Sequence, residues 1–432
     1  MKRRLLPLLA LALCLCACGK TEAPPARTPA PAVSAPAPTP TPAPTPDPLS
    51  EREVLDLTAA EALALCDTPE RCPKLRELRL TEPLSDPALP DAVRSAFPQA
   101  TLRYRVEFCD RSAREDTREL DLRDLPAERA EEAARALALL PELELVHLPE
   151  SWSAAEAAPF GALPGPVVLD WPFTMYYHDF NAADEQIRLT GVRIDDGGEA
   201  LRAVLPLLRS CKELNLEYSN LSDEELDALR RDYPEVNVVW RIFFGAYSTR
   251  TDVEKLLASL PDYWLDGEDC APLRYCTKVR YLDLGHNVID DISFVSSMPE
   301  LEVCILAINY WTDAGPLANC GNLEYLEMFT TGCRDLTPLK NLTALRHLNI
   351  TNLKELEDIT PLYGLSNLQR LWIGCLHKIP QEQLDEIRKR LPECEINTTT
   401  VIPTDEGWRT DPRYYLLRQQ FGYGLTASYA DH

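Results

Sequence analysis

Basic side chains are scarce in this sequence. Lys and Arg together number 44 against 68 Asp and Glu, which gives a net charge of −24 near neutral pH. Nucleic acid and anionic lipid headgroups are poor partners for such a surface. Because the acidic residues are spread along the chain, a soluble surface that resists aggregation explains most of the excess. A cationic partner stays open.

Short enzyme motifs are also missing. The chain has no GxSxG, no HExxH, no phosphate-binding glycine loop, and no CxxC after its first twenty residues. Its six histidines, at 147, 178, 286, 347, 377 and 432, are not at metal-ligand spacing. The cluster Asp195-Asp196-Gly197-Gly198 favours a turn, with a cation site or a catalytic role as the alternative. We therefore expect no catalytic residue, no metal and no cofactor.

A targeting signal occupies the first residues. A basic start at residues 2–4 precedes an apolar run over residues 5–15, which is too short to span a bilayer as a stable helix. The next residues, Leu15-Cys16-Ala17-Cys18, resemble the lipobox of bacterial lipoproteins. This resemblance implies that residues 1–17 are a signal peptide and that Cys18 carries the lipid, which anchors the protein by burying methylene groups. An ordinary secretory leader and an uncleaved membrane helix are the alternatives.

A segment rich in Pro, Ala and Thr follows the leader and extends to residue 50. Such a composition cannot form a core. Alternating prolines favour an extended polyproline conformation, and at about 3.1 Å per residue thirty residues would reach roughly 90 Å. We interpret residues 18–50 as a lipidated stalk that lifts a domain clear of the membrane.

A repeat of 22 residues begins at Val279. Its steps are 22, 22, 22 and 23 residues, and this regularity predicts a solenoid. Each unit supplies one short strand with inward apolar residues, a turn and a return segment, and only stacking buries the apolar face. The strand phrases are Val279-x-x-Leu282-x-Leu284, Leu301-x-x-Cys304-x-Leu306, Leu323-x-x-Leu326-x-Met328, Leu345-x-x-Leu348-x-Ile350 and Leu368-x-x-Leu371-x-Ile373.

A second phrase recurs between the strands, and it is clearest at Asp335-Leu336-Thr337-Pro338-Leu339 and Asp358-Ile359-Thr360-Pro361-Leu362. With the strand phrases, it resembles the internalin-like class of leucine-rich repeats over residues 279–373. The resemblance implies a curved solenoid in which Asn287 and Asn309 bond the backbone of neighbouring turns. Thr331 interrupts that ladder. The pattern is specific for the fold and much less so for function.

Upstream, the repeats are looser, with spacings of about 20 to 27 residues. A larger duplication relates Tyr104-Arg105-Val106-Glu107-Phe108 to Trp240-Arg241-Ile242-Phe243-Phe244 at an offset of 136. Each copy follows an amphipathic helical stretch, which indicates three sub-arrays with seams near residues 110 and 250. Candidate strands are Leu75-x-x-Leu78-x-Leu80, Leu120-x-Leu122, Leu140-x-x-Leu143-x-Leu145, Val167-x-Leu169, Ile187-x-Leu189 and Leu214-x-Leu216.

The cysteines allow two interpretations. Cys304 takes a leucine position of the repeat, and Cys320 and Cys333 fall on inward positions of the return segment, so burial explains all three. Two pairs, Cys66/Cys72 and Cys270/Cys276, each end three residues before a repeat begins. Each pair is either two buried thiols or a disulfide at the entry of its array, since disulfides are permitted outside the cell.

Aromatic residues mark two possible contact regions. The tail over residues 401–432 is rich in them, and we expect a short helix from Pro412 to about Phe421 to cap the open end of the last repeat. Strand alternation sends another set of residues to the concave face of the solenoid, and these are types common at protein interfaces. The exposed turns with Tyr310 and Trp311 are the alternative. The concave candidates are Tyr281, Val303, Ile305, Tyr325, Phe329, His347, Arg370 and Trp372.

These observations predict an α/β fold, a curved leucine-rich-repeat solenoid. Irregular repeats span residues 51–245, about five repeats of 22–23 residues lie within 246–400, and a C-terminal cap spans 401–432. We expect a lipid-anchored module on the extracytoplasmic face of a cell membrane that binds an extracellular protein or glycan and is not an enzyme. A structural scaffold of the envelope and an enzyme acting on wall glycans are the alternatives.

Overall fold

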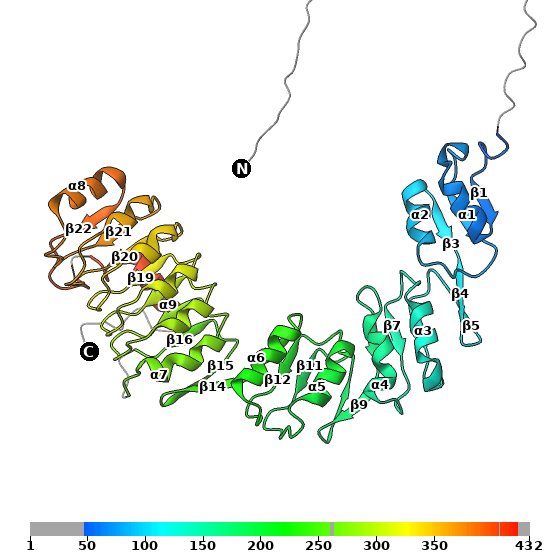
Figure 1. Ribbon diagram of the computed structural model, residues 1–432, viewed down its shortest axis with the longest axis horizontal. Coiled ribbons are helices and arrows are strands. Elements are labelled where there is room, and N and C mark those ends of the chain that lie inside the picture. Colours follow the sequence, from blue (N-terminus) through cyan, green and yellow to red (C-terminus); the bar gives the residue numbers. More distant parts are fainter. Residues whose placement is uncertain (1–46, 260–262, 406, 422–432) are drawn as a thin grey trace, which may run out of the picture.

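A computed structural model describes residues 47–259, 263–405 and 407–421, so Cys18 and nearly all of the expected stalk lie outside the described residues. Parallel strands form four successive stacks, called arrays 1 to 4 from here on. The arrays follow one another along a curved arch (Figure 1). This is the α/β repeat solenoid that the periodicity predicts.

Arrays 1 to 3 each contain three parallel strands joined by helical return segments. Array 1 comprises β1 (Val54–Leu57), α1 (Ala59–Cys66), η1 (Pro69–Arg71), β2 (Glu77–Leu80), α2 (Leu89–Ala96) and β3 (Thr101–Arg103). Array 2 comprises β6 (Glu119–Asp121), η2 (Ala127–Arg129), α3 (Ala130–Leu137), β7 (Leu145–His147), α4 (Ala154–Ala157), η3 (Ala158–Ala162) and β8 (Val168–Asp170). Array 3 comprises β11 (Gln186–Arg188), α5 (Glu199–Val204), η4 (Leu205–Leu207), β12 (Glu213–Asn215), α6 (Asp223–Asp232) and β13 (Asn237–Val239).

Array 4 is the regular part, with seven parallel strands in sequential order. Its return segments are mostly single turns of 3₁₀ helix, which suit a repeat of only 22 residues. The elements are β16 (Lys255–Leu257), α7 (Gly267–Cys270), η5 (Ala271–Tyr275), β17 (Tyr281–Asp283), η6 (Ser293–Ser297), β18 (Val303–Ile305), η7 (Gly315–Asn319), β19 (Tyr325–Glu327), η8 (Thr337–Asn341), β20 (His347–Asn349), η9 (Thr360–Gly364), β21 (Arg370–Trp372), α8 (Gln381–Arg390) and β22 (Glu395–Asn397). The tail then forms α9 (Pro412–Gln420).

An antiparallel hairpin separates each array from the next. The hairpins are β4 (Arg105–Phe108) with β5 (Arg111–Arg114), β9 (Pro172–Met175) with β10 (His178–Asn181), and β14 (Arg241–Phe244) with β15 (Tyr247–Arg250). A buried aromatic residue precedes each one, and Tyr104, Trp171 and Trp240 are 67 and 69 residues apart. The offset of 136 in the sequence is therefore two steps of one module, and the middle copy, around Trp171, was missed.

The inner core is a continuous ladder of apolar side chains. Leu282, Cys304, Leu326, Leu348 and Leu371 occupy the same place in the successive strands β17 to β21 and are fully buried. One core cluster extends from the first hairpin through arrays 2, 3 and 4. Array 1 has a separate cluster around Leu78. Array 1 therefore depends on its own packing more than the others do.

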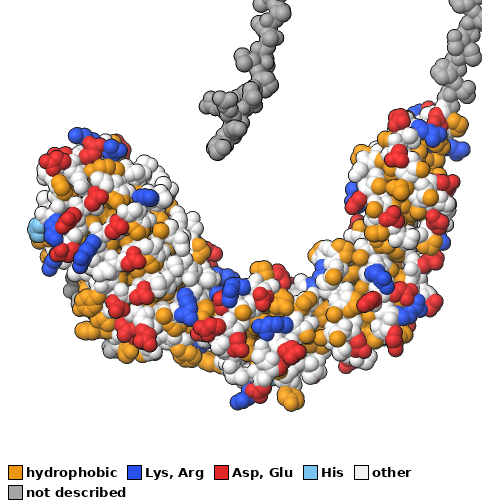
Figure 2. Space-filling model, viewed as in Figure 1, with side chains coloured by type: hydrophobic (Ala, Val, Ile, Leu, Met, Phe, Trp, Pro, Cys, Tyr) orange, Lys and Arg blue, Asp and Glu red, His pale blue; other side chains and the backbone are white. Residues whose placement is uncertain are grey.

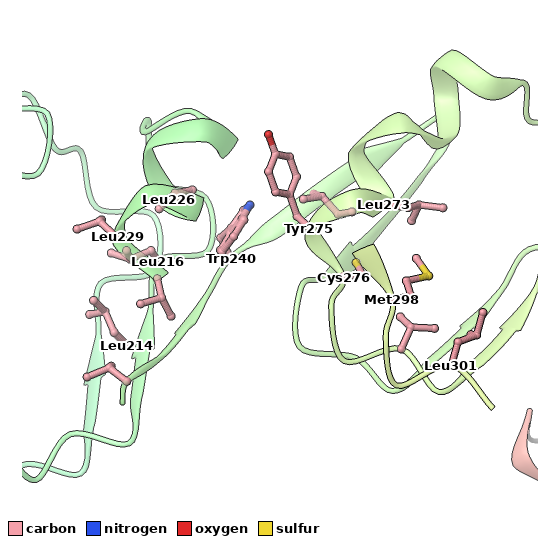
Figure 3. Packing of buried hydrophobic residues seen from close by; sticks show 14 of the residues in the cluster. Leu214, Leu216, Leu226, Leu229, Trp240, Leu273, Tyr275, Cys276, Met298 and Leu301 are labelled. Atoms are coloured by element: carbon pink, nitrogen blue, oxygen red, sulfur yellow. The ribbon is translucent and has the colours of Figure 1, made fainter. Parts of the chain in front are cut away.

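The junction between arrays 3 and 4 shows how that cluster crosses a hairpin. Trp240 and Tyr275 lie between the leucines of the two arrays (Figure 3), with ring centroids 5.7 Å apart. The indole Nε1 of Trp240 donates to Asp223 at 2.9 Å. The guanidinium of Arg230 lies 4.9 Å above the indole ring. Trp240 therefore connects the return helix of one array with the first return segment of the next.

The asparagine ladder confirms the sequence prediction. Asn309 accepts a hydrogen bond from the Ile289 backbone N–H at 3.0 Å and donates to the Leu284 and Leu306 carbonyls. Asn287 makes the corresponding bonds one repeat earlier, to Leu265 and Ala258 among others. At the next position, Thr331 only donates to the carbonyl of its own repeat, so the cross-repeat ladder ends there.

One predicted strand was placed in the wrong register. The inward residues of β7 are Leu143, Val146 and Leu148, all buried, and not Leu140, Leu143 and Leu145. Leu145 starts the strand and is only half-buried, while Leu140 packs in the return segment. Both phrases fit the leucine spacing, so the spacing alone does not decide between them.

The cysteines of the described residues are free thiols. Cys270 and Cys276 are fully buried, and burial raises the pKa of each thiol to about 12. Cys72 is likewise buried, whereas Cys66 is half-buried and donates to the Ala62 carbonyl. Of the two interpretations of these pairs, the structure has the buried thiols. A thiol with so high a pKa is a weak nucleophile near neutral pH.

Candidate functional site

Strand register brings the predicted contact residues together on one face of array 4. Tyr281, Val303, Tyr325, His347 and Arg370 are successive strand partners and form one column. Asp283, Ile305, Glu327, Asn349 and Trp372 form a second column two residues further along each strand. We call this side of the sheet, opposite the leucine ladder, the sheet face. Phe329 follows β19 at the edge of it.

The tail of the chain covers this face, and the expected exposed patch is therefore buried. Tyr281 is half-buried against Phe421, with ring centroids 6.4 Å apart. The other seven candidates are at most 6% exposed. The helix of the tail is where the sequence places it, but it packs on the sheet face and not across the open end of the last repeat (Figure 1). The aromatic sheet face offers it more apolar surface to bury than a single edge strand can.

Gly374 allows the chain to turn back onto the sheet. A β-carbon at this position would overlap the carbonyl oxygen of Thr400, so any other residue would displace the start of the tail. The tail then crosses the sheet against its strand order, from β21 toward β17. Pro403 contacts Asn349, Trp408 contacts Glu327, and Phe421 contacts Tyr281.

Trp408 is the centre of the contact, in an aromatic socket made by Tyr325, Trp372 and Arg370. Its side chain is fully buried, with ring centroids 5.5 Å from Tyr325 and 5.1 Å from Trp372. The guanidinium of Arg370 lies 4.6 Å above the indole. The indole Nε1 donates to Glu327 Oε1 at 2.7 Å, so the polar edge of the ring is satisfied. From here on, the socket means these three residues together with Glu327.

Glu327 is the charged floor of the socket. It is fully buried, and its second carboxylate oxygen lies 3.0 Å from Nη2 of Arg409 in the tail. The hydroxyl of Tyr325 donates to the same carboxylate. An unpaired buried carboxylate is strongly unfavourable, so the guanidinium next to Trp408 compensates a charge that the sheet itself supplies.

The sheet also binds the tail backbone. Nη2 of Arg370 donates to the carbonyls of Gly407 and Trp408 at 2.8 and 2.9 Å. Asn349 Nδ2 donates to the Pro403 carbonyl at 2.8 Å, and the Trp372 indole donates to the Asp405 carbonyl at 3.4 Å. These bonds are made to main-chain atoms, so they place no requirement on the side chains of the bound segment at these points.

Burial perturbs the acid at the other end of the face. It raises the pKa of Asp283 to about 7, with the Glu327 carboxylate acting in the same direction and the Gly285 N–H opposing them. The Tyr325 phenol has its pKa raised far above the usual value by burial and by Glu327. Asp283 and Glu327 were not among the residues predicted from the sequence, which are all aromatic, aliphatic or basic, although both acids lie in the same strand column. Two acidic residues in one strand column were the sequence signal that this face contains a charged site.

A smaller charged group lies on the corresponding face of array 2. His147 is bracketed by Glu119, 2.8 Å from Nε2, and Asp170, 2.5 Å from Nδ1. These two carboxylates raise the pKa of the imidazole. Arg123 closes the group with contacts to His147 and Asp170. Every member is paired with another, so the arrangement joins β6, β7 and β8 across the sheet.

Two other sequence candidates have structural explanations. Asp196 accepts from the backbone N–H groups of Gly198 and Ala200 and from the Tyr176 hydroxyl, and both glycines have positive φ, so this cluster is a turn. Tyr310 is 69% exposed, but Trp311 is fully buried and donates to the Leu306 carbonyl. Of these two aromatic residues on the turns, only Tyr310 is therefore exposed and able to make a contact.

No group of three or more His, Cys, Asp or Glu side chains in the described parts of the chain is placed to bind a metal ion. The helices within those parts are too short or too polar for any of them to cross a membrane. Acidic and basic side chains are interspersed along the visible face of the arch (Figure 2).

Comparison with solved structures finds bacterial leucine-rich-repeat proteins. An internalin of Listeria monocytogenes is 18% identical, with 77% of this chain and 78% of that chain covered and a TM-score of 0.28. Internalin C2 of the same organism is 20% identical over 52% and 87% of the two chains, at a TM-score of 0.29. A leucine-rich-repeat protein of Leptospira interrogans is 16% identical over 76% and 91%, at 0.31. No protein-family model matches the sequence, and no curated protein does.

Proposed function

We propose that this protein is a binding module at the outer surface of a cell, and that the sheet face of array 4 is where it binds an extracellular protein. The observation that carries the proposal is the socket, which already binds a peptide segment through ring packing, a buried ion pair and bonds to backbone carbonyls. A surface with these three elements matches the anatomy of protein-interaction hot spots.

The location of the module follows from the first part of the sequence. Leu15-Cys16-Ala17-Cys18 supports a lipid on Cys18, and the segment up to residue 50 supports a stalk between that lipid and array 1. In this arrangement the arch stands outside the cell on the extracytoplasmic face. Metabolic labelling with a palmitate analogue tests it. Label should be lost in Cys18→Ala, and unchanged labelling of that variant would contradict the anchor.

The binding function is tested by capture followed by a direct measurement. The full chain is incubated with extracellular proteins, captured proteins are identified, and each is purified and titrated against the protein. Tyr325→Ala with Trp372→Ala should weaken binding at least ~10-fold, because interface aromatics contribute the most on truncation. The exposed Tyr310→Ala is the matched control and should bind normally. Capture of nothing, with folding kept, would contradict the proposal and favour a scaffold in the envelope.

A further inference from the structure

We propose that the tail over residues 401–421 is a displaceable self-ligand, and that the natural partner presents a tryptophan followed by an arginine in a turn like the one that holds Trp408. This inference rests on the proposed function and names the chemistry of its partner. The tail would mimic that partner and cover the socket until the partner displaces it.

The socket has the features of a recognition site more than those of a core. Trp408 could be buried by any apolar neighbours, yet it is surrounded by three aromatic or cationic partners and by an acceptor for its N–H. A core position requires only volume, whereas directed hydrogen bonds and stacking select one ring type. The socket therefore prefers tryptophan, the aromatic residue with an N–H at its edge.

Glu327 sets the preference for the neighbouring residue. Its Oε1 accepts from the Trp408 indole and the Tyr325 hydroxyl, and its Oε2 accepts from the guanidinium of Arg409. A partner without a cation at this point would leave a buried carboxylate half-compensated. The negative charge of the whole chain would also favour the approach of a basic segment.

The array does not need the tail for its own fold. Inward residues such as Leu326 and Leu371 are buried on the other side of the sheet, and the strand ladder from β16 to β22 contains no strand of the tail. The tail can therefore leave without breaking a strand hydrogen bond or opening the leucine core.

The tail helix α9 also covers the sheet face incompletely. Leu416 is 60% exposed, and a cavity of about 230 Å³ remains between α9 and the sheet. Its lining includes Leu416 and Gln420 from the helix and Tyr281, Val303, Tyr325 and His347 from the sheet. A partner that fills this space would gain contacts that the tail does not make. That difference is what a competing ligand needs in order to displace a tethered one.

The test uses the full chain and one synthetic probe, a fluorescent peptide of residues 402–421. The anchor variant, Trp408→Ala with Arg409→Ala, should free the socket and bind the probe at least ~10-fold more tightly than the parent does, because the tethered tail no longer competes. Gly374→Ala is the second variant, since a β-carbon there would overlap Thr400 and displace the start of the tail, while the four socket residues keep their side chains. Circular dichroism and urea unfolding establish that each variant is folded.

Specificity is read from a double-mutant cycle in the anchor variant. Glu327→Gln should weaken the parent probe at least ~10-fold and should have a much smaller effect on a probe in which Arg409 is replaced by Ala. Equal affinity of the parent and both tail variants, or equal loss with both probes, would overturn the proposal. A dimer of the parent that the anchor variant loses would assign the tail to a second copy and overturn it as well.

This experiment is independent of the capture experiment, because it contains no extracellular protein. Failure of the probe to bind would overturn the self-ligand and leave the binding function to be judged by capture. If the probe binds, it should also compete with a captured partner for the anchor variant, and the absence of competition would place that partner elsewhere on the arch.

Discussion

Asn309 illustrates how much one side chain contributes in a solenoid. It satisfies a backbone N–H of the preceding repeat and carbonyls of two repeats, all of them buried. Asn309→Ala should lower the free energy of unfolding by about 2–3 kcal/mol, because buried polar groups lose their partner. Urea denaturation measures this. Asn322→Ala is the control, since Asn322 is exposed and makes one bond of 3.3 Å, and a comparable loss there would contradict the ladder.

Asp283 gives the protein a pH dependence of unusual sign. Its pKa of about 7 in the folded protein exceeds the value of 3.8 expected of an unfolded chain. Between these values the folded state binds more protons, so this group's contribution to stability falls as the pH rises and is least favourable above pH 7. Asp283→Asn should therefore stabilise the protein by on the order of 2 kcal/mol at pH 8, and by little near pH 4.

Urea unfolding at the two pH values tests this expectation. Asp313→Asn is a suitable control because Asp313 also accepts from the N–H two residues later but is exposed, and it should change stability little at either pH. Destabilisation by Asp283→Asn at pH 8 would show that the carboxylate is needed in its charged form, for instance by Arg409.

At the residue scale, the sequence predicted which side of the sheet each side chain takes, because alternation in a strand is local. It did not predict that Tyr325 and Trp372 are buried. Their cover comes from Trp408, and Glu327 and Trp408 are 81 residues apart in the chain. No periodicity carries information over such a distance, so an exposed aromatic face and a covered one have the same pattern.

Among the elements, the hairpins were the main surprise. The sequence predicted seams near the first and third, from the duplicated segments that begin at Tyr104 and Trp240, but it did not predict that they are hairpins. The second differs because Pro172 replaces arginine after the aromatic residue and its turn is Tyr176-Tyr177, both with positive φ. Only the spacing could have revealed the second hairpin, because the offset of 136 residues divides into two nearly equal steps.

Trp240 should be the critical residue of the third hairpin. Trp240→Ala removes its contacts with Tyr275, Asp223 and Arg230 and leaves a cavity at the junction, so we expect a loss of about 3–5 kcal/mol. The loss should also separate arrays 3 and 4, so that chemical denaturation shows one more transition than the parent does. Phe243→Ala in the same hairpin is 62% exposed in the parent and serves as the control. An unfolding curve with the transitions and midpoints of the parent would contradict the role of Trp240.

Across the whole molecule, stability should be uneven. Array 1 has a core cluster of its own, while arrays 2 to 4 share one. In a repeat protein each unit is stabilised by its own packing and by its neighbours, so an end with few shared contacts opens first. Leu78→Ala should cost about 2–5 kcal/mol and unfold array 1 alone.

Hydrogen exchange detected by mass spectrometry measures that prediction. Peptides from β1 to β3 should lose protection in Leu78→Ala, while those from β17 to β21 keep the protection of the parent. Leu63→Ala, also in array 1 but 47% exposed, is the control. Loss of protection throughout the chain would show that the arrays unfold as one unit.

The solenoid itself was predictable because repetition copies one local rule many times, and errors in single strands such as β7 do not alter it. The arrangement of arrays was only partly predictable, since it depends on hairpins that occur once per module. Where the tail packs depends on contacts between distant parts of the chain, such as the one between Trp408 and Glu327.

The hairpins have a mechanical consequence. Within an array, the hydrogen bonds between parallel strands carry tension along the stack. Each hairpin interrupts these bonds, so side-chain packing such as that of Trp240 joins the neighbouring arrays. Pulled between its stalk and a partner bound to array 4, the arch would therefore extend one array at a time, with array 1 opening first. Tension on the anchored protein would therefore lengthen array 1 before it distorts the socket in array 4.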